Sequence, residues 1–206
     1  MNLFITGTDT GVGKTYAARL LVRALRRAGL DTVPMKPICC GDRSDAEAMY
    51  EACDRDVTLN TINPVWYRTP ASPYTAAIVE NRPPDTALIR ETFERLRSRH
   101  RSIIVEGVGG WMVPIDRDYF VADMAVEFGL PVAVVVKNQL GAINHALLTV
   151  QDIERRGLEF AGVILNNMEL PDEVAMTNRA MLEELLGRPA LLEIKPGQTD
   201  LMLAVA

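Results

Sequence analysis

The 206-residue chain is poor in the residue types that build several common functional sites. It has two histidines and three cysteines, with no Cys or His pairs at the spacing of metal ligands. This pattern argues against a His- or Cys-based metal centre, and the separation of His100 from His145 argues against a histidine-dependent triad. An odd number of cysteines is typical of reduced thiols in a cytoplasmic protein. A redox switch at the adjacent Cys39 and Cys40 is the alternative.

Positive charge and long apolar runs are also lacking. The net charge is −5, and no basic stripe offsets it, which argues against a nucleic-acid scaffold. A small cluster at Arg23, Arg26 and Arg27 falls near the end of a predicted helix, where it complements the helix dipole. No apolar run approaches the roughly 20 residues that span a bilayer. No signal segment precedes the first predicted strand. We therefore expect a cytoplasmic protein with neither a membrane nor a nucleic-acid partner.

Apolar runs alternate with amphipathic stretches along the whole chain. The predicted strands cover residues 2–6, 32–36, 65–67, 102–106, 132–136, 161–165 and 190–194. The predicted helices cover residues 13–28, 45–52, 85–99, 122–128, 142–156 and 172–186, and residues 58–73 are predicted to be irregular apart from the short strand. Such alternation predicts an α/β fold in one domain, residues 1–206, with a mostly parallel sheet covered by helices on both faces.

A glycine-rich segment links the first predicted strand to the first predicted helix. Residues 7–15 read Gly-Thr-Asp-Thr-Gly-Val-Gly-Lys-Thr. Such a turn lets backbone N–H groups surround a phosphate at a helix N-terminus, while Lys14 reaches the outer phosphates and Thr15 ligates Mg²⁺. The loop is one residue longer than the usual phosphate-binding pattern. A strand–helix turn that binds nothing is the structural alternative, but such a turn requires neither the lysine nor the threonine.

Other charged residues follow predicted strands, where ligands bind in open parallel sheets. Lys36 offers a second positive charge to a phosphoryl group, and Glu106, followed by glycines, offers a carboxylate to Mg²⁺. The structural alternative for Lys36 is a lysine that faces solvent at a strand end, and the alternative for Glu106 and its glycines is a tight turn. Asp45 follows Ser44 at a predicted helix start, where Ser44 serves as the cap; capping and metal binding are compatible. Two further carboxylates, Asp9 and Asp116, lie in loops of the candidate site and are weaker candidates for a role in it.

Five segments together carry a resemblance to a known family. They are residues 7–15, Met-Lys-Pro at 35–37, Ser-Asp-Ala at 44–46, Glu-Gly-Val-Gly-Gly-Trp-Met-Val-Pro at 106–114 and Leu-Gly-Ala-Ile-Asn-His-Ala at 140–146. In this order they resemble dethiobiotin synthetase, a family in which the longer phosphate loop is itself a feature. The resemblance runs from about residue 3 to about residue 168, and the last two segments are more specific than a phosphate loop alone.

The resemblance implies a P-loop NTPase-like fold and an ATP- and Mg²⁺-dependent ligase of biotin synthesis. In that family one amine of 7,8-diaminononanoate combines with CO₂ to form a carbamate. The carbamate attacks the γ-phosphate of ATP, and the second amine captures the carbamic–phosphoric anhydride. The products are dethiobiotin, ADP and phosphate. No covalent enzyme nucleophile is needed, which agrees with a residue set of lysines and carboxylates.

The resemblance also implies roles for individual residues. Contacts to the reacting phosphate and carbamate come from Thr10, Lys14 and Lys36. The Mg²⁺ ligands are Thr15, Asp45 and Glu106. Nucleotide contacts come from Gly11, Val12, Gly13, Lys14, Thr15 and, for the base, Asn166, with Asn167 as the alternative. Diamine contacts come from Lys36, Cys40, Ser72, Pro73, Val108 and Gly109. The substrate carboxylate is bound across a homodimer interface by the helix start at Gly141, Ala142, Ile143 and Asn144.

Two departures from the family pattern leave details open. Cys40 precedes Gly41 where the family has a hydroxyl residue, and a thiol is a weaker donor. The proline after the last strand is shifted, which leaves the preference for ATP over other nucleotides open.

The first alternative function is a regulatory ATPase that positions other proteins. Such switches carry an additional lysine where Thr8 and Asp9 stand, and a basic membrane helix that residues 199–206 do not resemble. An amidotransferase-linked synthetase and a non-enzymatic binding module are the others.

Overall fold

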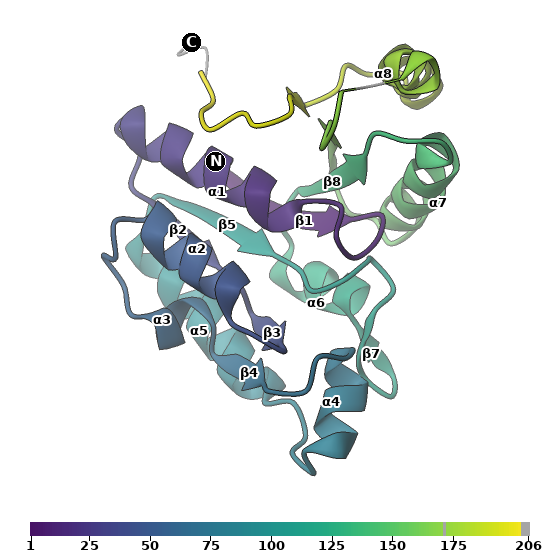
Figure 1. Cartoon of the computed structure of the whole chain (residues 1–206). Helices are drawn as coiled ribbons and strands as arrows, with labels where there is room; N and C mark the ends of the chain where they lie inside the picture. The colour runs from purple at the N-terminus through teal and green to yellow at the C-terminus, as the bar shows by residue number, and fades with distance from the viewer. Residues whose placement is uncertain (171, 203–206) are drawn as a thin grey trace.

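A six-stranded sheet forms the centre of the protein, seen in a computed structural model that describes residues 1–170 and 172–202 (Figure 1). The strands are β1 (Asn2–Gly7), β2 (Thr32–Met35), β5 (Ser102–Glu106), β8 (Val132–Lys137), β9 (Phe160–Asn166) and β10 (Leu192–Ile194). Their order is β10-β9-β8-β1-β5-β2, and every pairing between these strands is parallel. The direction of the strand order reverses at β1, where ligand sites form in such sheets.

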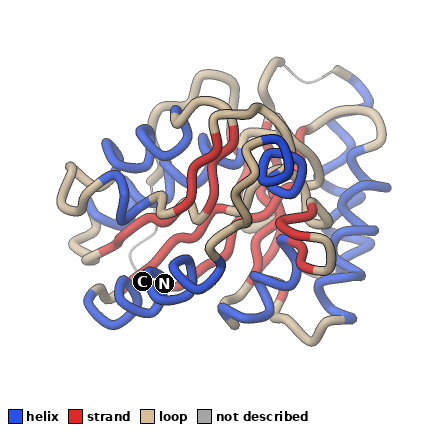
Figure 2. The backbone as a smooth tube through the Cα atoms, turned by 90° about the horizontal axis from the view of Figure 1, so that it is seen from below, coloured by secondary structure: helices blue, strands red, loops and turns tan. Residues whose placement is uncertain are grey.

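Helices cover both faces of the sheet (Figure 2). One face packs against α1 (Lys14–Arg27) and α2 (Ser44–Ala52). The other packs against α5 (Thr86–Arg99), α6 (Val121–Phe128) and α7 (Ala142–Arg155), and α8 (Glu173–Leu186) lies beside α7. Side chains alternate along β1, so that Leu3 and Ile5 enter the first core and Phe4 enters the second. The sheet therefore separates two apolar cores.

Smaller elements lie near the carboxyl ends of β2 and β5. The strands β3 (Ile38–Cys40) and β4 (Val65–Tyr67) pair in parallel, and β6 (Pro114–Asp116) pairs with β7 (Tyr119–Phe120) antiparallel. Two short helices accompany them, α3 (Leu59–Ile62) and α4 (Pro73–Val79). Each is capped by a side-chain oxygen, from Thr58 and Ser72 respectively. Together these elements form a small lobe beside the main sheet (Figure 1).

The predicted fold class is confirmed, and the long elements agree with the sequence pattern to within one or two residues at most ends. Three predictions of detail are wrong. Residues 58–73 are not simply irregular, because they contain α3 and lead into α4. The last strand begins at Leu192 rather than at residue 190. Ser44 is not a helix cap: α2 starts at Ser44 itself, and the Asp42 carboxylate accepts hydrogen bonds from the Ser44 N–H and hydroxyl.

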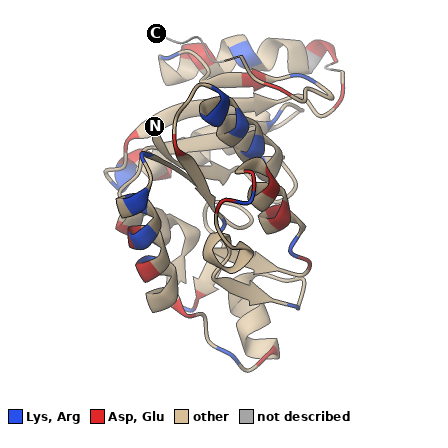
Figure 3. Ribbon diagram, turned by 90° about the vertical axis from the view of Figure 1, so that its left-hand side faces the viewer, with Lys and Arg blue, Asp and Glu red and all other residues tan. Residues whose placement is uncertain are grey.

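The charged residues of α1 are all basic and those of α2 are all acidic, whereas α5, α7 and α8 carry both signs (Figure 3). Within the described ranges, the helices are too short or too polar to cross a bilayer. All three cysteines are free, as expected for reduced thiols.

Candidate active site

A cleft of about 730 Å³ opens at the carboxyl ends of β1, β2 and β5. Most of the residues predicted to bind ligands line it: Thr10, Gly11, Gly13, Lys14, Thr15, Lys36, Cys40, Asp45, Ser72, Pro73, Glu106, Val108 and Gly109. They come from segments far apart in the sequence. The sheet order brings these segments together because β1 lies next to β5, and β5 lies next to β2.

The phosphate loop follows β1 and depends on two glycines with left-handed backbone. Gly11 has φ of +74° and Gly13 has φ of +92°, a region that L side chains rarely adopt. Gly13 also lies against the Asn166 amide, so a Cβ atom at residue 13 would overlap it. The Asn166 Nδ2 donates to the Val12 carbonyl at 2.9 Å. Asn166 therefore supports the loop from the end of β9.

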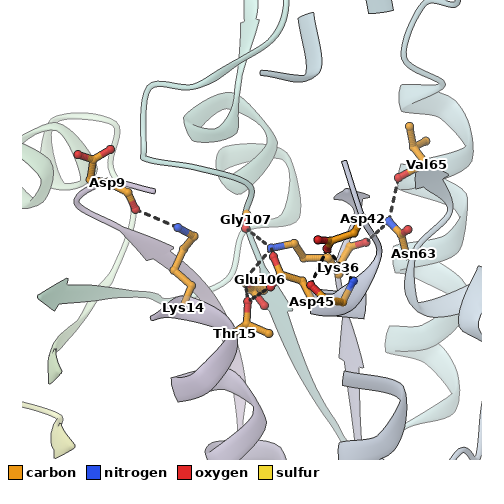
Figure 4. Close-up of polar contacts among 11 residues, drawn as sticks. Asp9, Lys14, Thr15, Lys36, Asp42, Asp45, Asn63, Val65, Glu106 and Gly107 are labelled. Atoms are coloured by element: carbon orange, nitrogen blue, oxygen red, sulfur yellow. Dashed lines mark hydrogen bonds and ion pairs between the residues drawn. The ribbon is translucent and has the colours of Figure 1, made fainter. Parts of the chain in front are cut away.

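A cluster of charged and polar groups lies next to the loop (Figure 4). The Lys36 Nζ donates to the Glu106 Oε1 at 2.6 Å, to the Asp45 Oδ2 at 2.9 Å and to the Gly107 carbonyl at 3.2 Å. The Thr15 hydroxyl lies 2.6 Å from the Asp45 Oδ1 and 2.8 Å from the Glu106 Oε1. The side chains of Lys36 and Glu106 are 2% and 0% exposed, so this ion pair is shielded from water.

Burial and charge shift the pKa values of this cluster. Burial would lower the pKa of Lys36, but the Glu106 and Asp45 carboxylates outweigh it and raise that pKa above its usual range. Burial raises the pKa of Glu106, against the opposing effect of Lys36. Burial also acts to raise the pKa of Asp45, yet Lys36 and the Thr15 hydroxyl bring it below its usual value. Lys36 is therefore an ammonium group held between two carboxyl groups.

The donor set fits a hard divalent cation. The Glu106 Oε2 is buried and has no hydrogen-bond partner among the described residues. The Thr15 hydroxyl and one Asp45 oxygen lie on the same side of the cluster. Mg²⁺ is typically bound by one or two carboxylates together with substrate phosphates and water. The Glu106 and Asp45 carboxylates and the Thr15 hydroxyl are oxygen donors of this kind, beside the loop predicted to bind phosphate.

The other side of the cleft is less charged. Ser72 caps α4, accepting a hydrogen bond from the Thr75 N–H at 3.3 Å, and Pro73 is the first residue of that helix. Burial raises the pKa of Cys40 to about 11, so its thiol is neutral. Gly109 has φ of +62°, and a Cβ atom there would lie 2.7 Å from Val113. This wall is suited to an apolar chain with few polar contacts.

Several predicted residues lie away from the cleft. Val12 is a buried residue of the phosphate loop, and Asn166 is buried behind that loop. The segment from Gly141 to Asn144 opens α7 after β8, outside the described cleft lining. Asp116 lies exposed on β6, also outside that lining. The Asp9 side chain instead accepts a hydrogen bond from the Thr10 N–H at 2.7 Å.

Sequence reasoning missed other residues that line the cleft: Tyr16, Cys39, Asp42, Ser44, Pro70, Ala71 and Val113. Three of them had a signal in the sequence, since Ser44 belongs to the 44–46 segment. Tyr16 directly follows Thr15 in the first turn of α1, and Val113 belongs to the 106–114 segment. The segment 70–71 had none, because its position depends on the packing of the small lobe.

The lowered pKa of Lys14 predicts that nucleotide binding depends on pH. Burial, together with repulsion from Lys36, lowers the pKa of Lys14 to about 8. The free protein therefore loses this charge as the pH rises through 8, while a bound triphosphate favours the charged form. We expect the Kd for an ATP analogue to be about tenfold higher at pH 9 than at pH 7. Calorimetry in buffers of different ionisation enthalpy measures both Kd and the proton taken up on binding.

Lys14→Arg is the control for this pH dependence, because arginine stays charged throughout the range. The variant should bind the analogue with little change between pH 7 and pH 9. A wild-type Kd that is flat over the same range, without proton uptake, would contradict the assignment of Lys14 to the phosphates.

Comparisons with known proteins agree with this geometry. A family model described as an AAA domain matches residues 1–202. The chain is 47% identical to the ATP-dependent dethiobiotin synthetase of Akkermansia muciniphila, over 96% of this chain and 93% of that protein. It is 39% identical to the ATP-dependent dethiobiotin synthetase of Methanocaldococcus jannaschii, over 80% of this chain and 78% of that protein.

Several solved structures have a similar fold at low sequence identity. The septum site-determining protein MinD of Pyrococcus horikoshii, solved with Mg-ADP, superposes with a TM-score of 0.62 at 16% identity, covering 95% of this chain and 82% of that one. A ParA family ATPase of Chlorobium tepidum gives a TM-score of 0.56 at 18% identity, covering 96% and 85%. These likenesses show a P-loop NTPase-like fold, and the much higher identities to the synthetases confirm the resemblance that the motifs indicated. The chain belongs to the dethiobiotin synthetase family.

Proposed function

We propose that this protein closes the ureido ring of dethiobiotin from 7,8-diaminononanoate, CO₂ and ATP, releasing ADP and phosphate. The observation that carries the proposal is the convergence of Lys14, Lys36, Thr15 and two carboxylates in a single cleft beside an apolar wall. This set can position anions and neutralise charge. It contains no activated nucleophile, and the proposed reaction needs none.

In the proposed mechanism the phosphate loop and Lys14 hold the triphosphate at the N-terminus of α1. Thr10, at the rim of the loop, and Lys36 contact the reacting phosphate and the carbamate. Thr15, Asp45 and Glu106 hold Mg²⁺, which when bound supplies further neutralisation of the phosphate charge. As the carbamate oxygen bonds to the γ-phosphorus and the bond to ADP breaks, Lys36 would stabilise the negative charge on the transferring phosphoryl group, as electrostatic clamps do in phosphoryl transfer; phosphate leaves later, when the second amine closes the ring.

Recognition of the nucleotide base is assigned to the end of β9. The Asn166 amide donates to the Val12 carbonyl, which leaves its oxygen as an acceptor for an amino group of the base. Asn167 lies next to it, and its Nδ2 donates to the Ile194 carbonyl at 3.0 Å. We propose that Asn166 reads the base, because it lies directly behind the loop.

A homodimer is part of the same proposal. The start of α7 lies outside the cleft. The Ala142 N–H donates to the Gln139 carbonyl at 3.1 Å, but no side chain caps this helix, and the N–H groups of an uncapped first turn are good partners for a carboxylate. We propose that a second copy of the chain supplies Gly141–Asn144 to the substrate carboxylate. A cytoplasmic location is also proposed, supported by the three free thiols.

Asn144→Ala tests the interface. If this helix start binds the substrate carboxylate, the variant should raise KM for the diamine about tenfold and leave KM for ATP within about twofold. Steady-state kinetics with each substrate varied gives both values, and sedimentation reports the dimer. An increase confined to the KM for ATP, or a monomeric wild type with full activity, would contradict this part of the proposal.

Phosphate release in the complete reaction tests the proposed function. Purified protein receives diamine, bicarbonate, Mg²⁺ and ATP, and each component is then omitted in turn. Turnover should require all four, and dethiobiotin should form in equal amount to phosphate. ATP hydrolysis that does not depend on the diamine would instead favour a regulatory ATPase, the class that shares this fold.

A further inference from the structure

The Lys36 ammonium takes up one oxygen of each carboxylate that is proposed to hold Mg²⁺, the Glu106 Oε1 and the Asp45 Oδ2. We infer that Lys36 is a placeholder cation: it holds the two carboxylates in position in the free protein and leaves them when Mg²⁺ arrives with nucleotide, moving toward the reacting phosphate. The inference rests on the magnesium site of the proposed function.

Hydrogen bonding supports this inference first. An ammonium group has three donors, and the three acceptors of Lys36 are the Glu106 Oε1, the Asp45 Oδ2 and the Gly107 carbonyl. In the free protein Lys36 is therefore saturated and faces the carboxylates rather than the open cleft (Figure 4). Lys14 contrasts with it: its ammonium donates to the Asp9 carbonyl in the loop at 3.0 Å. Because all three of its donors are used, Lys36 must give up at least one of these hydrogen bonds before it can contact a phosphate.

Electrostatics supplies the reason for exchange. A magnesium ion lies about 2.1 Å from its oxygen ligands. The Lys36 nitrogen lies 2.6 Å from the Glu106 Oε1 and 2.9 Å from the Asp45 Oδ2. A cation bound to the same two carboxylates would therefore meet the ammonium in a buried site, where like charges repel strongly. A triphosphate brings several negative charges, so it both carries the divalent cation and attracts the released lysine.

The exchange makes the position of Lys36 depend on whether Mg²⁺ is bound. Without Mg²⁺, Lys36 stays bound to the two carboxylates and does not contact the reacting phosphate. With Mg²⁺ bound, Glu106 and Asp45 keep a positive partner, so neither carboxylate is left unpaired. The lysine becomes available only when the metal is present. This ordering would limit phosphate loss from nucleotide bound without its cation.

Lysine-selective NMR tests the exchange in the wild-type protein. The chain has four lysines, so [¹³Cε]-lysine labelling gives four signals, and Lys36→Arg and Lys14→Arg assign two of them. Saturating β,γ-imido ATP without Mg²⁺ should move the Lys14 signal and leave that of Lys36 in place. Subsequent Mg²⁺ should then move the Lys36 signal.

The other outcomes are distinguishable. A Lys36 signal that moves before Mg²⁺ is added, or that never moves while Lys14 responds, overturns the exchange and leaves the proposed nucleotide site intact. If neither lysine responds to the analogue with Mg²⁺, the proposed function fails and the exchange fails with it.

A second measurement uses Mn²⁺ binding to the nucleotide-free protein, followed by electron paramagnetic resonance. Lys36→Met removes the competing ammonium, so Mn²⁺ should bind at least about tenfold more tightly than to the wild type. Lys14→Met changes the net charge by the same amount but breaks only a bond to a backbone carbonyl, and should change the affinity less than about threefold. Equal affinities for wild type and Lys36→Met, with both folded by circular dichroism, would overturn the inference. If Lys36→Met does not fold, the wild-type NMR experiment decides.

Discussion

Lys36→Met is expected to lower kcat about 10³-fold, the size of effect seen when one preorganised charge or donor is removed from a reacting anion. The physical reason is that Lys36, an ammonium buried beside Glu106 and Asp45, is the cation proposed to stabilise the carbamate and the reacting phosphate. Steady-state phosphate release with saturating substrates measures the loss. Nucleotide affinity should change far less, because Lys14 and the loop backbone remain.

The same substitution also affects folding, and the two effects must be separated. Removing one partner of a buried ion pair costs about 3–5 kcal/mol, since Glu106 is left charged and unpaired. The double variant Lys36→Met/Glu106→Gln removes both charges and should recover most of that stability in urea unfolding. It should not recover activity. A stable Lys36→Met protein with a kcat near that of the wild type would remove Lys36 from the mechanism.

Gly13→Ala is expected to weaken nucleotide binding at least about 100-fold. The new methyl group would overlap the Asn166 amide, and residue 13 would be held at a φ of +92° that costs about 1–2 kcal/mol for an L residue. Both effects distort the loop whose N–H groups are proposed to surround the phosphates. Titration with a fluorescent ATP analogue gives the affinity, and thermal unfolding shows whether the fold is retained.

Gly11→Ala is the matched control for this substitution. Gly11 has a similar φ, +74°, but no atom of the described residues lies within 4 Å of the place that its new methyl group would take. It should therefore carry only the backbone strain and lose about tenfold in affinity. Adding Asn166→Ala to Gly13→Ala should relieve the overlap and recover part of the loss. Equal losses for Gly11→Ala and Gly13→Ala would show that contact with Asn166 is unimportant.

Sequence pattern was sufficient for the long elements and for the charged side of the cleft, whereas the residues of its less charged side came from the family resemblance: Cys40, Ser72, Pro73, Val108 and Gly109. The phosphate loop, Lys36 and Glu106 each follow or end a strand, and the geometry of a parallel sheet brings such positions to one edge. The start of α4 was also within reach, because Ser72 followed by Pro73 has the residue types of a helix cap and first turn. The short helix α3 was not, since a single turn has too few residues to show a period.

Contacts between distant segments were beyond the sequence pattern. The ion pair between Lys36 and Glu106 exists because β2 pairs with β5. The bond from Asn166 to Val12 depends on the phosphate loop reaching past β8 to the end of β9. A residue type alone does not show whether an asparagine reads a base or supports a loop, so the role predicted for Asn166 remains a prediction.

The division of the interior into two cores has a consequence for how this site can change over generations. Lys14 and Thr15 are anchored in α1, above one core, whereas the segment after Glu106 leads into α6, above the other. Side chains behind one wall of the cleft belong to a different core from those behind the other, although Val57 packs against both. We therefore expect a substitution behind the wall proposed to face the organic substrate to disturb the proposed nucleotide wall little, a route by which one scaffold can acquire new acceptors.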